Sequence, residues 1–169
     1  MEKTIIALVG MSGSGKDLIA SHLEYHLSIP RLVSYTTRPR RANETDGVEH
    51  YFVDNEFFET QSNFLAYALF GGEHYWTRLD QIPDGACTYN IDEKALLEMR
   101  KKFGDQYRIF AVLVKRPGID EKKIGKERMK RDADRTILPD DYYDAIINND
   151  STITKVLLEA EEKIMNLLK

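Results

Sequence analysis

A short stretch near the N-terminus constrains the chain more than any other part of it. Residues 4–9 form an apolar run rich in β-branched side chains, which predicts a buried strand. Glycines follow at positions 10, 13 and 15, where the backbone can adopt positive φ and approach a ligand closely. Residues 17–27 then carry apolar side chains at helical spacing. A glycine-rich loop that leads into a helix N-terminus directs free N–H groups at one point, so this stretch suits a bound phosphate.

The loop also matches the P-loop pattern Gly-x4-Gly-Lys, in which the lysine reaches the outer phosphates of a nucleotide. The residue after the lysine usually carries the hydroxyl that meets Mg²⁺, and here that residue is Asp17. We therefore expect ATP at the loop and the start of the helix. The residues predicted to bind it are Gly10, Ser12, Gly13, Ser14, Gly15, Lys16, Asp17 and Leu18.

Composition narrows the possible partners and the compartment. The 169 residues predict one domain with a sizeable core, and the net charge of −4 gives no broad basic footprint for nucleic acid or an anionic membrane. The single cysteine, Cys87, cannot form an internal disulfide, which is typical of a reducing cytoplasm. No signal peptide or membrane-spanning run is expected, and the four histidines lack the spacing of a zinc site.

The order of predicted elements indicates a parallel sheet covered by helices. The first helix should end near Pro30, and residues 31–35 should form a second strand. Strand, crossover helix and strand form the βαβ unit of parallel sheets. A further buried strand is expected at 107–114, and residues 64–77 should form two strands about a glycine turn.

A basic segment follows the expected second strand. Arg38, Arg40 and Arg41 lie beside hydroxyl side chains, and Pro39 stiffens the backbone between them. Guanidinium groups match phosphate oxygens in geometry, so the segment predicts an anion clamp.

The P-loop followed by Ser34-x-Thr-Thr-Arg38-x-x-Arg41-x-x-Glu44-x-x-Gly47 resembles the guanylate kinases, which transfer the ATP γ-phosphoryl group to GMP. The resemblance covers most of the chain. It implies a three-layer α/β P-loop NTPase fold with a parallel five-stranded sheet, a small inserted acceptor-binding lobe and a shortened lid. In this reading residues 1–169 form one domain, with its core at 1–34 and 83–169, the lobe at about 35–82 and the lid at about 118–135.

The resemblance also implies roles for the acceptor residues. Arg38, Arg41 and Tyr75 would bind the acceptor phosphate, with either His50 or Tyr51 in the place of a further phosphate-binding tyrosine. Ser34, Thr77 and Asp92 would lie beside the base, although Asp92 is equally suited to capping the helix that follows it. Lys16, Arg38, Arg128 and Arg131 are the residues expected to act in catalysis, the last two by neutralising the transferred group.

Three positions depart from the family pattern. Ala66 stands where the family has a glutamate that reads guanine. Asn90 replaces a carboxylate near Mg²⁺, whereas Asp17 introduces one after the P-loop lysine. Either Asp17 substitutes for the missing carboxylate in an oxygen-rich magnesium site, with Asn90 nearby, or that site has decayed.

The prediction is therefore a cytoplasmic, magnesium- and ATP-dependent phosphotransferase acting on GMP, dGMP or a related monophosphate. Two alternatives stay open. Gly-Lys-Asp in the P-loop and the absence of the glutamate at 66 also resemble ribose 1,5-bisphosphate phosphokinase, whose acceptor has no base. Guanylate-kinase-like domains of scaffold proteins bind peptides instead, but they have lost much of the P-loop that this chain keeps.

Overall fold

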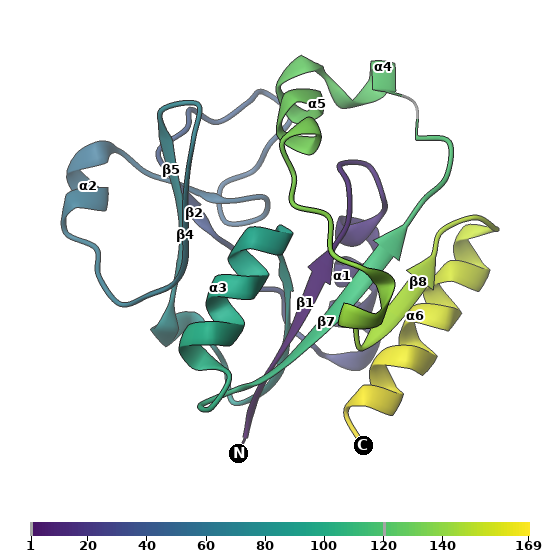
Figure 1. Ribbon diagram of the computed structural model, residues 1–169. Helices are drawn as coiled ribbons and strands as arrows, with labels where there is room; N and C mark the ends of the chain where they lie inside the picture. The colour runs from purple at the N-terminus through teal and green to yellow at the C-terminus, as the bar shows by residue number, and fades with distance from the viewer. Residues whose placement is uncertain (1, 120) are drawn as a thin grey trace.

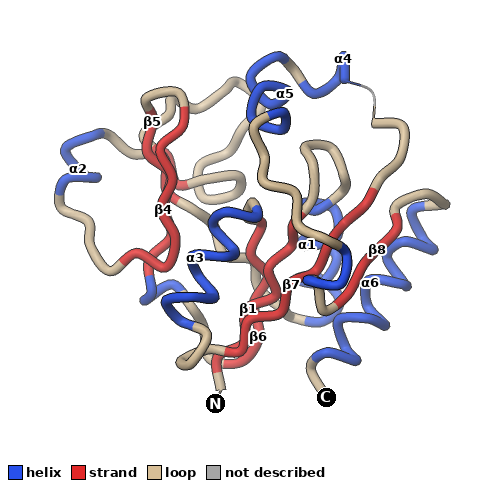
Figure 2. The backbone as a smooth tube through the Cα atoms, viewed as in Figure 1, coloured by secondary structure: helices blue, strands red, loops and turns tan. Residues whose placement is uncertain are grey.

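The computed structural model describes residues 2–119 and 121–169; position 120, within the expected lid, lies outside the described residues. One sheet forms the centre, with its four strands parallel and in the order β6-β1-β7-β8 (Figures 1 and 2). The strands are β1 (Lys3–Val9), β6 (Gly85–Asn90), β7 (Arg108–Lys115) and β8 (Ala145–Asn148).

Helices cover both faces of this sheet and give it three layers. Ile6 and Leu8 of β1 pack toward α1 (Lys16–Leu27) and α6 (Ile153–Leu167). The alternate residues of β1 pack with Leu96 of α3 (Glu93–Phe103) on the opposite face. A strand buried on both faces reads as a continuous apolar run, which is why residues 4–9 were recognisable as a strand. The predicted three-layer fold is confirmed.

The fifth strand expected at residues 31–35 is reduced to a single parallel bridge. Thr88 of β6 bonds to the backbone on either side of Arg31, with its amide donating to Pro30 O and its carbonyl accepting from Leu32 N. Beyond this bridge the chain turns away into a second sheet. The central sheet therefore has four strands among the described residues.

The second sheet lies within residues 35–78 and has the strand order β3-β2-β5-β4. A glycine turn at Gly71–Gly72 joins its two long strands, as predicted. This sheet and its short helix form a distinct lobe beside the core (Figure 1). The elements are β2 (Tyr35–Thr36), β3 (Tyr51–Phe52), α2 (Asn55–Glu59), β4 (Phe64–Phe70) and β5 (Glu73–Arg78).

The charged stretch after β7 forms two short helices, α4 (Glu121–Ile124) and α5 (Lys126–Ala133). Short 3-10 turns occur at Leu79–Gln81 and Asp140–Tyr142. Within the described ranges, no helix has both the length and the apolar character needed to cross a bilayer.

Candidate active site

The P-loop connects the carboxyl end of β1 to α1. Gly15 occupies the N-cap of α1 with φ 107°, and a Cβ there would lie 2.6 Å from Nδ2 of Asn149. The same Nδ2 donates to Ser14 O at 2.8 Å, so the end of β8 holds the loop in place. Glycine is required at position 15 because both the positive φ and the close amide exclude a side chain.

Lys16 lies folded against the loop that it follows. Its Nζ donates to Gly10 O at 2.6 Å and to Met11 O at 2.9 Å. Burial is the main cause that lowers the pKa of Lys16 to about 8, and the nearby Arg135 and Arg131 lower it further. The carboxylates of Asp17 and Asp132 act in the opposite direction, so charges of both signs lie near the amine.

Asp17 and Asn90 are in contact. Such contact is expected if these two departures from the family pattern belong to one magnesium site. Asn90 Nδ2 donates to Asp17 Oδ1 at 2.9 Å, and Arg31 lies 3.8 Å from the same oxygen. Asn90 Oδ1 is buried and has no hydrogen-bond partner among the residues described. A carboxylate and an unsatisfied amide oxygen side by side are the ligand types that Mg²⁺ prefers.

Helix α5 lies above the P-loop (Figure 1). The Asp132 carboxylate accepts from Ser12 N at 3.1 Å and from Ser12 Oγ at 3.2 Å, and Arg131 donates to the same hydroxyl at 3.1 Å. Ile119 and Ile124 approach Gly13 closely. Arg128 is exposed on α5. The expected lid segment thus contacts the loop directly.

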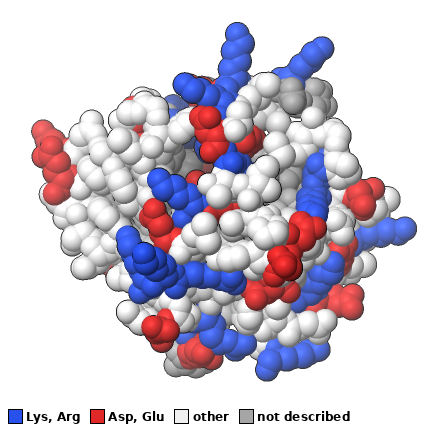
Figure 3. Space-filling view, viewed as in Figure 1, with Lys and Arg blue, Asp and Glu red and all other residues white. Residues whose placement is uncertain are grey.

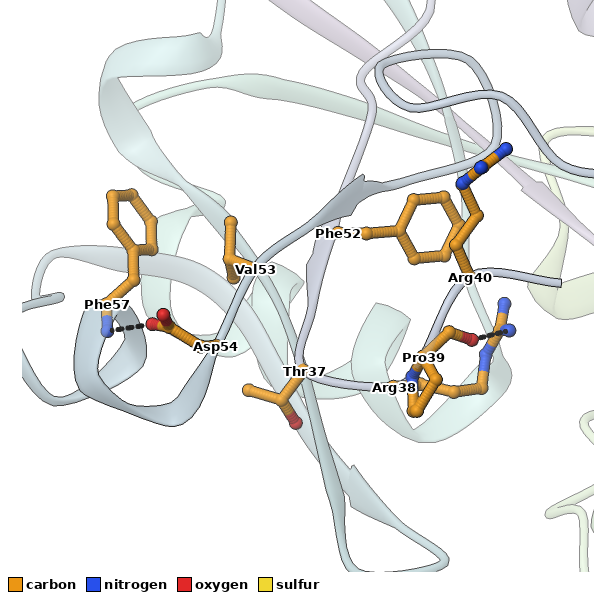
Figure 4. Close-up of a pocket in the computed structure, with 8 residues that line it drawn as sticks. All are labelled: Thr37, Arg38, Pro39, Arg40, Phe52, Val53, Asp54 and Phe57. Carbon is orange, nitrogen blue, oxygen red and sulfur yellow. Dashed lines mark hydrogen bonds between the residues drawn. The ribbon is translucent and has the colours of Figure 1, made fainter.

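The predicted anion clamp is held together by Glu44. Arg38 donates two hydrogen bonds to its carboxylate at 3.0 and 2.8 Å, and Arg41 N donates a third at 2.8 Å. Glu44 is only 7% exposed, and the bond from Arg38 is the main cause that lowers its pKa to about 2. The Arg38 guanidinium also bonds to Pro39 O and lies over the Phe52 ring, beside an open pocket of about 440 Å³ (Figure 4).

The structure separates the two candidates that the sequence offered for one phosphate-binding position. His50 Nδ1 lies 2.8 Å from Ser34 Oγ, and its ring is 5.7 Å from that of Tyr75. Tyr51 instead packs against Tyr35, with the ring centroids 4.8 Å apart and the rings tilted. His50 therefore lies with Ser34 and Tyr75, two of the residues expected to bind the acceptor. Burial followed by the Arg38 charge lowers the pKa of His50.

The residues expected beside the acceptor base have partners within the protein. The Thr77 hydroxyl is fully buried and donates to Tyr89 Oη at 2.8 Å. Asp92 accepts from Ala95 N at 2.8 Å and caps α3. Ala66 lines a small cavity of about 190 Å³ between β4 and α3, together with Glu98. Because position 66 is an alanine, its side chain offers no polar group to an acceptor base.

An ion pair joins the lobe to α5. Arg41 of the clamp donates to Glu127 of α5 at 2.9 Å, so the clamp is in side-chain contact with the helix that contacts Ser12. On the face shown in Figure 3, basic and acidic side chains lie next to one another.

Comparison with known proteins decides the family. The family model for guanylate kinase matches residues 1–165. The chain belongs to the guanylate kinase family. Guanylate kinase of Chlorobium chlorochromatii is 29% identical over 183 residues, covering 97% of this chain and 95% of that protein. Guanylate kinase of Haemophilus influenzae is 33% identical over 160 residues, covering 82% and 77%.

Solved structures agree with this fold. Guanylate kinase from Anaplasma phagocytophilum matches 99% of this chain and 85% of its own, with a TM-score of 0.67 and 23% identity. The APS kinase of Mycobacterium tuberculosis matches 99% of both chains, with a TM-score of 0.55 and 16% identity. At these sequence identities, the similarity of this guanylate kinase family member to both solved structures shows a shared fold.

Several residues at the site were not among those that the sequence singled out. Glu44 belongs to the family pattern, but no role was assigned to it from the sequence. An acidic residue three positions after Arg41 could have indicated a partner for the arginines. Asp132, Asn149 and Arg135 gave no such signal, because each meets its partner across more than 40 positions of sequence.

Proposed function

We propose that this protein transfers the γ-phosphoryl group of ATP to GMP, dGMP or a related monophosphate. The observation that carries the proposal is the link from Arg41 to Glu127, which brings the anion clamp next to the helix that contacts the P-loop. The clamp and the P-loop both contact α5, and such proximity is what passage of one phosphoryl group between their ligands would require. Family membership supports the same reaction.

In the proposed reaction, an oxygen of the acceptor phosphate attacks the γ-phosphorus and the bond to the β–γ bridging oxygen breaks, releasing ADP. The acceptor oxygen is already ionised, so no general base is needed. Positioning and charge neutralisation account for catalysis of this kind. We assign Lys16 and the loop amides to the donor phosphates, and Arg128 and Arg131 to the transferred group. The residues assigned to the acceptor phosphate are Arg38, Arg41, His50 and Tyr75.

The test is an ADP-release assay with Mg·ATP and a panel of acceptors: GMP, dGMP, AMP, CMP, UMP and ribose 1,5-bisphosphate. Turnover on GMP and dGMP supports the proposal as stated. Turnover only on ribose 1,5-bisphosphate would favour the sugar-phosphate alternative, which is compatible with Ala66 and with the internal partners of Thr77 and Asp92. ATP binding without turnover on any acceptor would contradict the enzymatic proposal.

Guanine selectivity should improve when a carboxylate is restored at position 66. Ala66→Glu is expected to raise kcat/KM for GMP relative to AMP by about tenfold or more, because a carboxylate can accept two N–H groups of the guanine edge and such a pair contributes about 1–3 kcal/mol of discrimination. The cavity beside Ala66 gives the longer side chain room. Ala66→Gln, of equal size but without the charge, is the matched control. An unchanged GMP to AMP ratio in the glutamate variant would contradict this prediction.

We propose that Asp17 and Asn90 hold Mg²⁺ at the donor phosphates. The buried, unpartnered Asn90 Oδ1 beside the Asp17 carboxylate fits an oxygen-ligated ion. When bound, the ion neutralises phosphate charge. The protein's own part is to keep the two side chains together at the end of β6 and the start of α1.

Asp17→Ala is expected to weaken Mg²⁺ binding by about 10- to 100-fold, since it removes the only carboxylate in contact with Asn90 among the described residues. Calorimetric titration of Mg²⁺ in the presence of a non-hydrolysable ATP analogue measures this directly. Adding Asn90→Asp to the Asp17→Ala variant should restore much of the affinity by returning one carboxylate to the pair. Undiminished Mg²⁺ affinity in Asp17→Ala would show that Asp17 is not a ligand.

We also propose a cytoplasmic location. Cys87 is buried, and burial raises its pKa to about 12, so the thiol stays protonated and unreactive. An unpaired thiol of this kind is typical of a reducing compartment.

A further inference from the structure

A buried ion pair joins the end of the helix that covers the P-loop to the core. Arg135 Nε donates to Glu93 Oε2 at 2.9 Å and its Nη2 donates to Glu93 Oε1 at 2.5 Å, a two-point contact. The Arg135 side chain is 9% exposed and that of Glu93 is 6% exposed. Asp132 lies 3.7 Å from the same guanidinium.

The pair is costly to bury, which makes its position informative. Two charges removed from water are compensated only when geometry is good and the remaining donors and acceptors are satisfied. An apolar pair of similar volume often serves stability as well or better. Fold stability alone is therefore a weak explanation of why Glu93 and Arg135 are charged.

Both partners are placed next to the candidate site. Glu93 is the first residue of α3, three positions after Asn90. Arg135 comes two positions after α5 ends and four after Arg131, which donates to Ser12 of the P-loop. The buried pair therefore fixes the chain within about one helical turn of the arginine that contacts the loop.

The other contacts of this helix differ in how strongly they can hold it. The Arg41–Glu127 pair at its beginning joins side chains that are 41% and 76% exposed. Exposed pairs contribute little because water and salt screen them. Asp132 and Arg131 both bond to Ser12, an interaction that a bound donor phosphate can alter. The Asp132 side chain is 7% exposed and Ser12 is 6% exposed, so that contact is buried as well. Of the described contacts of this segment, the Glu93–Arg135 pair is the buried one that joins it to α3.

We infer that Glu93 and Arg135 are positioning residues, whose buried pair holds the last turn of α5 over the P-loop so that Arg131 stays beside the donor phosphates. The inference rests on the proposed kinase function for its consequence in catalysis. Of the charged groups that lower the pKa of Lys16, Arg135 has the largest effect, which agrees with its place beside the P-loop.

The test compares Glu93→Gln and Arg135→Lys with the wild type. Each variant keeps much of the side-chain volume but loses the charge or the two-point geometry. Glu159→Gln, at the partly exposed Glu159–Lys163 pair of α6, is the matched control. Amide hydrogen exchange of residues 126–133 is measured without any ligand, and kcat and KM are then measured for the acceptor that the panel identifies.

The expected result is faster exchange in α5, by about tenfold or more, with exchange in α6 unchanged. We also expect kcat to fall about tenfold or more while KM for the acceptor stays within about twofold, because the clamp is not altered. The double variant Glu93→Gln/Arg135→Lys should resemble the single variants, since the two residues act as one unit. The control should match the wild type in both measurements.

The two arms separate failure of the inference from failure of the proposed function. Unchanged exchange in α5 of Glu93→Gln would overturn the inference whatever the activity. Faster exchange with unchanged kcat would show a purely structural pair and overturn the positioning role. A wild type without turnover on any acceptor would contradict the kinase proposal, and with it the catalytic consequence, while the exchange arm would still decide whether the pair holds α5.

Discussion

Lys16→Met is expected to lower kcat of phosphoryl transfer by about 10²–10³-fold, the usual cost of removing one preorganised charge or donor from a transition state. The side chain is positioned by the P-loop, where its Nζ donates to the carbonyl oxygens of Gly10 and Met11. Donor phosphates would replace those carbonyls as partners. Steady-state ADP release measures the effect. The exposed Lys155→Met on α6 is the control, and it should behave as the wild type.

The pH dependence of ATP binding provides a second measurement of the same residue. The pKa of Lys16 is lowered to about 8, so the free protein loses this positive charge as the pH rises through that value. Affinity for ATP should therefore fall by about tenfold or more between roughly pH 7.5 and 9.5, as expected for a group titrating near 8 whose charged form binds. The Lys16→Met variant should lack this dependence. A pH profile shared by both proteins would show that another group is responsible.

Local sequence patterns were sufficient to predict most of the fold. Apolar runs, a helical period and the glycine turn at Gly71–Gly72 correspond to the strands, helices and hairpin of the structure. The strand expected at residues 31–35 does not form in the central sheet, and the reason is physical. Pro30 has no amide hydrogen to donate, and Tyr35 pairs with Trp76 of the lobe, where their rings stack at 5.4 Å. Tertiary pairing thus determined the sheet to which this segment belongs.

The candidate site was predictable only where its residues are close together in the sequence. The P-loop and the anion clamp are local patterns with a direct chemical meaning. The contact of Asp132 with Ser12 and the pair of Arg135 with Glu93 depend on where α5 is placed, and no spacing in the sequence encodes that placement. Likewise, the sequence did not show that His50 contacts Ser34 whereas Tyr51 packs against Tyr35.

Glu44→Gln is expected to destabilise the lobe by about 3 kcal/mol at neutral pH, because it leaves the Arg38 guanidinium without its buried counter-charge. The single tryptophan, Trp76, lies in the lobe and is 1% exposed, so its fluorescence during urea unfolding reports on this region. Glu49→Ala on the same loop is the control: its carboxylate is exposed and accepts one bond from Thr45 N, so a smaller change is expected.

Acid titration tests the same pair with a defined sign. The folded protein holds the pKa of Glu44 at about 2, below its ordinary 4.5, so the unfolded chain binds this proton more readily. The stabilisation is therefore complete above about pH 4.5 and is lost as the pH falls toward 2; a shift of this size corresponds to about 3 kcal/mol. The wild type should lose stability over this range more steeply than Glu44→Gln. Parallel curves for the two proteins would show that the Arg38–Glu44 contact does not stabilise the clamp, and that the arginines are oriented by something other than this carboxylate.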